Sequence, residues 1–335
     1  MQAAIYGLEA LELNASEQSF FRDADPVGFV LFKRNCETRD QLQRLTDSLR
    51  NLTGRADLPI LIDQEGGRVA RMKAPEWPEF PGGPVFGALY DKAPISAIEA
   101  VRANARAIAL MLHSVGVNVD ALPLLDVRQE GASDIIGDRA LGNEPMQVAA
   151  LGRAVLDGLA SAGVVGIVKH MPGHGRALVD SHKELPVVTA SAEELDSDLE
   201  PFERLSWAPM GMTAHVVYTA WDPDRPASMS PIVIRGIIRE RIGFGGFLMS
   251  DDIGMEALQG DFGSRAAGVV AAGCDVALHC SGKMDEMIAV AAAVPKLSTD
   301  GEDRLARAMA TTMVESEGPD FAEAIATRDT LLALA

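Results

Sequence analysis

The stretch that decides the fold reads Val164-Val165-Gly166-Ile167-Val168-Lys169-His170-Met171-Pro172-Gly173-His174-Gly175. Its first half is a short apolar run typical of a buried strand. Its second half opens into a glycine-rich loop that carries charged and imidazole side chains. A strand that ends in such a loop is a common way to place an active site on an α/β scaffold.

Similar apolar runs recur along the chain, with helical patterns between many of them. Several are apolar on both faces, as expected for strands of a covered parallel sheet. We predict eight strands, at Ala3–Gly7, Val27–Phe32, Leu58–Asp63, Val117–Ala121, Val165–His170, Gly211–His215, Gly246–Ser250 and Asp275–Leu278. This alternation predicts an α/β fold, a (β/α)₈ TIM-type barrel formed by residues 1–335 as a single domain. An open doubly wound sheet is the alternative, but the glycine-rich dinucleotide turn that would favour it is missing after the first run.

Helix starts are predicted from capping pairs and from proline. The pairs place a Ser or Thr three residues before a Gln or Glu, and proline is favoured in the first turn. The predicted starts are Thr38 with Gln41, Ser96 with Glu99, Pro145 in a first turn, and Ser191 with Glu194.

The composition excludes some classes of protein. The formal net charge is −18 and the pI is about 4.7, which disfavours nucleic acid as a partner. Apolar runs are interrupted by charges, so no membrane span is expected. The first sixteen residues lack the pattern of a signal peptide. With only three cysteines, these features predict a cytoplasmic location.

Polar side chains follow the predicted strands at the ends that share one mouth of a barrel. They are Asp63, Asp120, His170, His215 and Asp251. Asp252 follows Asp251 directly, and successive strand residues point to opposite sides. We therefore expect only one of these two aspartates to enter the mouth. There it would act as a nucleophile or stabilise a cationic transition state, unless it only caps a helix or accepts a buried hydrogen bond.

The loop after the decisive strand holds a second pair, Asp180 and His182. In an extended loop their side chains lie on the same side, and a neighbouring carboxylate raises the pKa of imidazole. This arrangement suits a general acid near neutral pH, although a surface ion pair has the same pattern. His170 and His174 have a metal-ligand spacing, but Pro172 and Gly173 disfavour the helix it requires. We predict no metal and no other cofactor. His174 is expected only to brace the loop.

Two further segments contain arginine residues that could contact a ligand. One follows a predicted strand, and the other follows a long polar loop. In Ile62–Arg71, Asp63 is placed to accept hydrogen bonds from adjacent hydroxyls, and arginine donates in a rigid fork. A purely structural role is the alternative for this segment, with Gly66-Gly67 as a turn and Glu65 and Arg68 as a structural pair. Ile136–Arg139 supplies another arginine. Together with Lys169 these groups suit a polyhydroxylated small molecule.

Four segments carry a resemblance to glycoside hydrolase family 3, in particular to its single-domain bacterial β-N-acetylhexosaminidase branch. The likeness spans nearly the whole chain, and the run around Lys169 is the most specific part of it. The segments are Ile62–Val69, Lys169–Gly175, Asp180–Pro186 and Ser250–Met255.

The resemblance implies a retaining double displacement on a (β/α)₈ barrel. Asp251 matches the nucleophile of the family, His182 the acid/base residue of this branch, and Asp180 its partner. The positions that hold N-acetylglucosamine (GlcNAc) match Asp63, Arg71, Arg139, Lys169 and His170. The implied substrate is a cell-wall fragment, GlcNAc linked β-1,4 to anhydro-N-acetylmuramic acid, met in the bacterial cytoplasm.

The sequence departs from the family pattern at Met171, Arg176 and Gly254, where phenylalanine, a small or acidic residue and serine are usual. None of these is a proposed catalytic group. The alternatives that stay open are a broader β-glycosidase and a glycoside phosphorylase with a histidine acid. A metal-dependent hydrolase using His170, His174, His182 and Asp251 and an inactive binding protein are further alternatives. Oligomeric state is not predicted.

Overall fold

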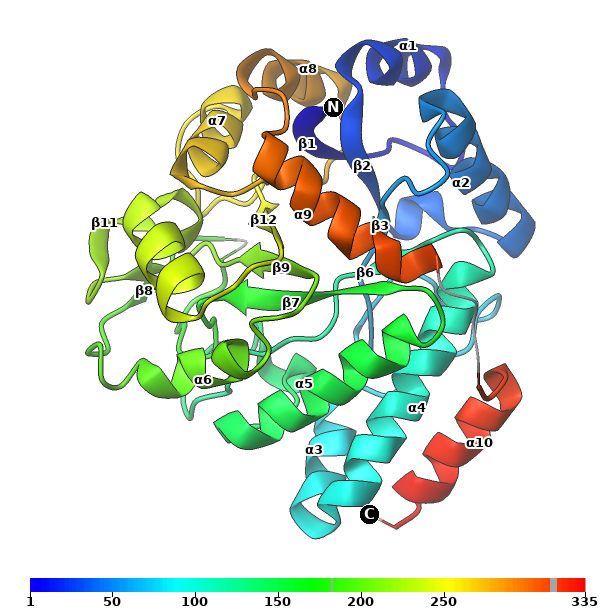
Figure 1. Ribbon diagram of the computed structural model, residues 1–335, viewed down its shortest axis with the longest axis vertical. Helices are drawn as coiled ribbons and strands as arrows, with labels where there is room; N and C mark the ends of the chain where they lie inside the picture. Colours follow the sequence, from blue (N-terminus) through cyan, green and yellow to red (C-terminus); the bar gives the residue numbers. More distant parts are fainter. Residues whose placement is uncertain (182, 314–317, 335) are drawn as a thin grey trace.

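The computed structural model describes residues 1–181, 183–313 and 318–334. Eight parallel strands close into a barrel, in the order β1-β13-β12-β9-β7-β6-β3-β2 (Figure 1). Their bounds are β1 Gln2–Gly7, β2 Pro26–Leu31, β3 Ile60–Ile62, β6 Val119–Asp120, β7 Val165–Met171, β9 Met210–Thr213, β12 Phe247–Asp252 and β13 Val276–His279. Each overlaps one predicted strand, so the α/β barrel is confirmed.

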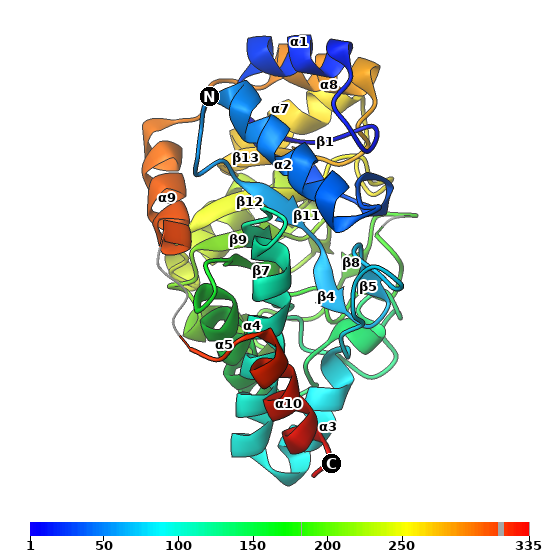
Figure 2. The ribbon, with the colours of Figure 1, turned by 90° about the vertical axis from the view of Figure 1, so that its right-hand side faces the viewer.

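Helices surround this barrel and occupy the connections between its strands (Figures 1 and 2). They are α1 Ala15–Ala24, α2 Arg39–Thr53, α3 Gly83–Lys92, α4 Pro94–His113, α5 Pro145–Ala160, α6 Asp196–Arg204, the π-helix Val233–Arg241, α7 Phe262–Ala272, α8 Met284–Ala293, α9 Thr299–Met309 and α10 Phe321–Leu332. Short 3₁₀ turns lie at Lys33–Asn35, Gly137–Arg139, Ala227–Met229 and Ala310–Met313. In the described ranges, no helix combines the length and the apolar character needed to cross a membrane.

Side chains inside the barrel form a core separate from the one between barrel and helices. Its members come from alternate positions of the strands, such as Ile5, Ile167 and Phe247. Leu305 and Met309 of α9 belong to the same cluster. Helix α9 therefore closes the amino-terminal end of the barrel, which leaves the carboxyl end for the site. Figure 2 shows α9 at one end and the small strands β4, β5, β8 and β11 at the other.

Two small sheets extend the carboxyl end of the barrel. One is a hairpin of β4 Gln64–Gly66 and β5 Val69–Ala70, directly after β3. The other contains β8 Val187–Val188, β10 Val217–Tyr218 and β11 Asp222–Pro226. Gly66 has a φ of +91°, and a Cβ there would lie 2.4 Å from the carbonyl oxygen of Pro81. The hairpin therefore requires glycine at this turn.

The predicted helix starts are correct in part. Pro145 opens α5 as expected. The hydroxyl of Thr38 accepts from the Gln41 amide, but the Gln41 side chain accepts from Glu37 rather than from Thr38. Ser191 and Glu194 form both capping bonds on a turn that precedes α6, which begins at Asp196.

The start predicted at Ser96 is wrong. Helix α4 begins at Pro94, immediately after the single residue Ala93 that separates it from α3. Proline at the first position has no N–H to satisfy and a φ suited to the helix, so the N-cap is Ala93, three residues before Ser96.

Candidate active site

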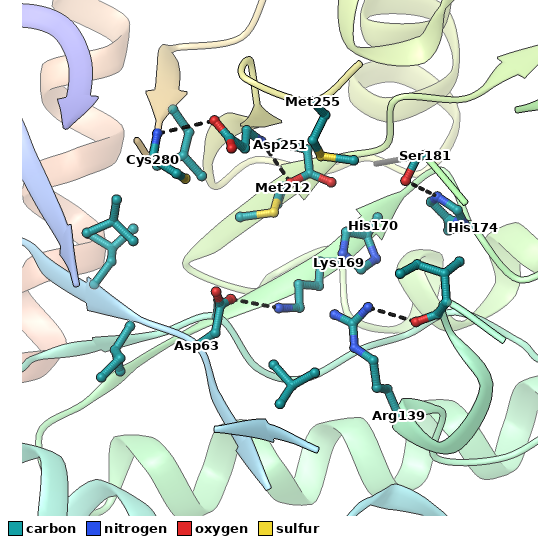
Figure 3. A pocket seen from close by; sticks show the side chains of 18 of the residues that line it. Asp63, Arg139, Lys169, His170, His174, Ser181, Met212, Asp251, Met255 and Cys280 are labelled. Carbon is teal, nitrogen blue, oxygen red and sulfur yellow. Dashed lines mark hydrogen bonds and ion pairs between the residues drawn. The ribbon is translucent and has the colours of Figure 1, made fainter. Parts of the chain in front are cut away.

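A cavity of about 260 Å³ opens at the carboxyl end of the barrel (Figure 3). This volume lies near the small end of the range for ligand pockets and suits one sugar ring better than an extended ligand. Charged, imidazole, hydroxyl and sulfur-bearing side chains line it, from six of the barrel strands and the loops after them. They include Asp63, Arg71, Arg139, Lys169, His170, His174, Ser181, Met212, Asp251, Asp252, Met255 and Cys280.

An alternating row of ion pairs forms one wall of the cavity. Arg71 donates to Asp63 at 2.8 Å, and the Lys169 ammonium lies 3.3 Å from Asp63 and 2.7 Å from Glu65. Arg139 contacts both oxygens of Glu65, at 2.7 and 2.8 Å, in a bidentate pair. Lys169 and Glu65 are almost fully buried, so this row is screened little by water.

The row keeps all five groups charged. Burial alone would raise the pKa of Asp63, but Lys169 and Arg71 outweigh it and hold that pKa well below its ordinary value. Burial likewise opposes the charge of Lys169, yet Glu65 and Asp63 raise its pKa. Asp63, Arg71, Arg139 and Lys169 therefore present fixed acceptors and donors to the cavity, which is what recognition of several hydroxyls needs.

We expect Lys169→Met to destabilise the fold strongly. The substitution leaves Asp63 and Glu65 facing each other without the cation between them. Breaking a buried ion pair in this way costs roughly 3–5 kcal/mol of unfolding free energy. Denaturant unfolding of the purified variant measures the loss. The double variant Lys169→Met/Glu65→Gln is the control, because it removes the stranded charge and should recover part of the stability. Equal losses in both would contradict the electrostatic explanation.

His170 is fixed by a carboxylate that the sequence analysis did not single out. Asp126 is fully buried, and its Oδ2 lies 2.7 Å from His170 Nδ1. Its Oδ1 accepts from the backbone N–H groups of His170 at 3.1 Å and His174 at 2.6 Å. Burial raises the pKa of Asp126, but His170 and His174 together lower it to about 2. An ionised Asp126 therefore sets the orientation of His170 and directs its other ring nitrogen away from this contact.

His174 is buried beside His170 but has a different partner. Its Nε2 lies 3.2 Å from the hydroxyl of Ser181. Burial, and then the neighbouring His170, lower its pKa to about 4, so its ring is neutral at neutral pH. The ring centroids of the two histidines are 5.7 Å apart. The His170 ring is held by a carboxylate and the His174 ring by a hydroxyl. That neither ring binds a metal stays a prediction.

We expect the protonation of His174 to destabilise the fold in acid. Its pKa is about 4 in the folded chain and near 6.5 when unfolded. The unfolded state therefore binds the proton first, and stability is lost as the pH falls from about 6.5 to about 4. The loss is on the order of 3 kcal/mol. Unfolding free energies between pH 7 and 4 measure it, with His174→Gln as the variant that lacks this titration. Parallel curves for the two proteins would contradict the prediction.

The expectation for the aspartate pair is wrong, because both Asp251 and Asp252 line the cavity. The pairing of β12 with β13 shifts register between Met249 and Asp252, which breaks the simple alternation of side chains. Asp252 Oδ1 accepts from the N–H groups of Gly254 at 2.9 Å and Cys280 at 3.2 Å. Burial raises the pKa of Asp252. Both carboxylates thus lie on the cavity wall, and Asp251 Oδ1 accepts from the Asp252 N–H at 2.8 Å.

Two of the five strand-end residues do not line the cavity. Asp120 and His215 are both fully buried. Asp120 Oδ1 accepts from the Gln64 N–H, and burial raises its pKa well above the ordinary value. The ring nitrogens of His215 lie 2.7 Å from the Ser228 hydroxyl and 3.0 Å from the Asp252 carbonyl. These two residues instead contact the backbone of Gln64 and of Asp252, next to the residues that line the cavity.

The predicted acid/base pair is only partly described. His182 lies outside the described residues. The Asp180 carboxylate lies 3.9 Å from Lys183 and is partly exposed. Asp180 is not among the lining residues, whereas Ser181, next to it in the chain, is. The roles of Asp180 and His182 therefore stay predictions.

Three features of the site were not predicted from the sequence. They are the role of Asp126, the identity of the cations that pair with Glu65, and the place of Ser181 on the cavity wall. Glu65 pairs with Arg139 and Lys169, and Arg68 instead pairs with Asp138. Asp126 directly follows the apolar residues Leu124 and Leu125. An acidic residue at the end of an apolar run was the feature of the sequence that could have indicated a buried carboxylate. Its partners lie 44 and 48 residues further along the chain, and nothing local in the sequence indicates them.

Comparison with known proteins identifies relatives of this chain. A family described as the glycosyl hydrolase family 3 N-terminal domain matches residues 2–311. A beta-hexosaminidase of Aromatoleum aromaticum is 38% identical over 273 residues, which cover 79% of this chain and 76% of that protein. Native NagZ from Neisseria gonorrhoeae superposes with a TM-score of 0.87 at 31% identity, covering 99% of this chain and 98% of that one. The complex of this NagZ with N-trifluoroacetyl-D-glucosamine superposes with a TM-score of 0.86 at 32% identity, and it covers the same shares of the two chains.

The match extends through all eight barrel strands and includes every residue that lines the cavity. A beta-hexosaminidase of Alkalilimnicola ehrlichii is likewise 38% identical, over 280 residues that cover 82% of this chain and 79% of that protein. By this evidence the chain belongs to glycosyl hydrolase family 3, and it is a glycoside hydrolase of the beta-hexosaminidase type.

Proposed function

We propose that the protein is a retaining exo-β-N-acetylglucosaminidase. It removes terminal non-reducing GlcNAc from GlcNAc-β-1,4-anhydro-N-acetylmuramic acid, with or without attached peptide. The observation that carries the proposal is the small cavity in which Asp251 lies on one wall and the ion-pair row on another. The related NagZ, crystallised with an N-acylated glucosamine, supports the choice of sugar.

In the proposed first step, Asp251 attacks the anomeric carbon while His182 gives its proton to the leaving oxygen. The glycosidic C–O bond breaks as the Asp251–sugar ester forms. In the second step water attacks the same carbon, His182 accepts a proton from it, and the ester C–O bond breaks. The sugar leaves with its original anomeric configuration, because the carbon is inverted twice.

The ion-pair row is proposed to hold the sugar during both steps. Asp63 accepts hydrogen bonds from ring hydroxyls, and Arg71, Arg139 and Lys169 donate to hydroxyl or carbonyl oxygens. His170, oriented by Asp126, adds a ring nitrogen to the same set. Because Glu65 and Asp63 already fix the cations, little rearrangement is needed when the sugar binds.

The cellular setting is part of the proposal. We infer that the enzyme acts in the bacterial cytoplasm on fragments released during cell-wall turnover. Cys36, Cys274 and Cys280 are all free thiols, which suits a reducing compartment. Muropeptide fragments are the proposed partners.

The test compares p-nitrophenyl β-N-acetylglucosaminide with the plain β-glucoside, with and without phosphate, and before and after a chelator. We expect the enzyme to hydrolyse the N-acetylglucosaminide faster than the glucoside. Phosphate should not raise the rate, and the chelator should not lower it. Preference for the plain glucoside would contradict the substrate. Formation of a sugar phosphate would indicate the phosphorylase instead, and loss with chelator the metal-dependent hydrolase. Release of GlcNAc from the anhydro disaccharide, followed by mass spectrometry, tests the natural substrate.

A further inference from the structure

Phe32 is an aromatic residue of the cavity wall that has no part in the proposed reaction so far. It follows β2 directly, and Arg71 follows the hairpin that extends β3, the neighbour of β2 in the barrel. Both residues line the cavity. The Arg71 Cζ lies 4.9 Å from the centroid of the Phe32 ring, which is within the range of a cation–π contact.

The other contacts of Arg71 hold its guanidinium only at one edge. Asp63 accepts from Nη2 at 2.8 Å, and the Gln64 side chain accepts from the Arg71 backbone N–H at 3.0 Å. In the part of the chain that the structure describes, Arg71 Nε is buried without a hydrogen-bond partner. A buried N–H without a partner costs free energy, and the negative face of an aromatic ring attracts it. The Phe32 ring therefore offsets a cost that Asp63 leaves in place.

The Phe32 ring is itself held in place. Its backbone N–H donates to the side chain of the fully buried Asn35 at 2.9 Å. The Arg34 guanidinium also lies 4.9 Å from the ring centroid, and it donates to two backbone carbonyls at 2.7 and 2.5 Å. Because both of these neighbours are fixed, the ring gives Arg71 a rigid surface to lie against.

We propose that Phe32 is a positioning residue for sugar binding, because its ring face holds the Arg71 guanidinium in the orientation that meets the sugar. The inference rests on the proposed function, in which Arg71 donates to the sugar. Without the ring, the guanidinium would lose freedom only when the sugar binds, and this ordering weakens binding. An alkyl side chain fills the same space but does not attract a cation, so the aromatic face is the property required.

The experiment is a double-mutant cycle on the hydrolysis of p-nitrophenyl β-N-acetylglucosaminide. Its proteins are the wild type, Phe32→Leu, Arg71→Ala and the double variant. We expect Phe32→Leu to raise KM about 3- to 30-fold and to change kcat by less than about twofold. In the Arg71→Ala background, the same substitution should change kcat/KM by less than about twofold, because the group through which Phe32 acts is gone.

Two further variants and one further measurement complete the design. Phe32→Tyr keeps the ring face and should keep KM close to the wild type. Phe244→Leu is the matched control, because its ring faces Arg239 at 5.4 Å and is not among those that line the cavity. It should leave KM unchanged. Competitive inhibition by GlcNAc is measured alongside, since KM equals a dissociation constant only when chemistry is slow. Thermal unfolding checks each protein.

Equal losses of kcat/KM with and without Arg71 would overturn the inference, because Phe32 would then act on the sugar directly or only on the fold. Equal rises of KM in Phe32→Tyr and Phe32→Leu would overturn it as well. If Phe32→Leu fails to fold, Phe32→Met takes its place in the cycle. A wild type that hydrolyses no aryl N-acetylglucosaminide overturns the proposed function and this inference together. An active wild type with additive losses overturns only the inference.

Discussion

Asp251→Ala is expected to reduce kcat by at least about 10³-fold. Acid–base catalysis contributes about 10²–10⁴-fold in enzymes, and the nucleophile provides the covalent route itself. Steady-state hydrolysis of the p-nitrophenyl N-acetylglucosaminide measures the loss. A variant that keeps more than a few per cent of the activity would show that another group attacks the sugar.

Asp252→Asn is the matched control for the proposed nucleophile, Asp251. Asparagine keeps the oxygen that accepts from Gly254 and Cys280, and the raised pKa of Asp252 favours a neutral group there. We expect a much smaller loss than in Asp251→Ala. Trapping with a fluorinated sugar, followed by peptide mass spectrometry, should place the adduct on Asp251. An adduct on Asp252 would reverse the assignment.

His182→Ala is expected to lower kcat/KM by about 10²–10⁴-fold for substrates with poor leaving groups, which is the contribution of a general acid. Histidine suits this role beside an aspartate nucleophile, because their ordinary pKa values differ by roughly 2.6 units. One group is then ionised while the other still holds a proton. Most retaining enzymes use two carboxyl groups and need burial to separate their pKa values.

The leaving-group dependence distinguishes lost acid catalysis from general damage. A dinitrophenyl substrate should form the glycosyl-enzyme at nearly the wild-type rate and release a burst of phenol. Breakdown then stays slow, because no base activates water, and azide should restore it and give the glycosyl azide. An equally slow first step with every leaving group would contradict the assignment of His182 as the acid.

The barrel strands were predictable because each is a short apolar run buried on both faces. Strand β7, where all seven residues are buried, is the clearest case. The helix start at α4 was missed because Pro94 competes with the capping signal at Ser96. The pattern of β12 failed for a different reason. Alternation assumes a regular ladder, whereas β12 shifts its register against β13 before Asp252, whose carboxylate accepts from the Cys280 N–H.

The site was predictable only where its residues belong to compact motifs. Asp63, Lys169 and His170 lie in such motifs and line the cavity. Asp126 does not, since its partners are far along the chain. Glu65 was identified, but its local neighbour Arg68 was assigned as the partner. The true partners, Arg139 and Lys169, become neighbours only when the barrel closes.

The ion-pair row also affects how ligands reach the cavity. Three cations alternate with two carboxylates through contacts of 3.3 Å or shorter, so the row carries a net charge of only +1 and projects little field into solvent. A chain of net charge −18 therefore repels an anionic fragment before that fragment meets any arginine. Ionic strength shortens the range of this repulsion to about 10 Å at 0.1 M. Capture of carboxylate-bearing fragments should accelerate with added salt, while capture of uncharged sugars stays the same.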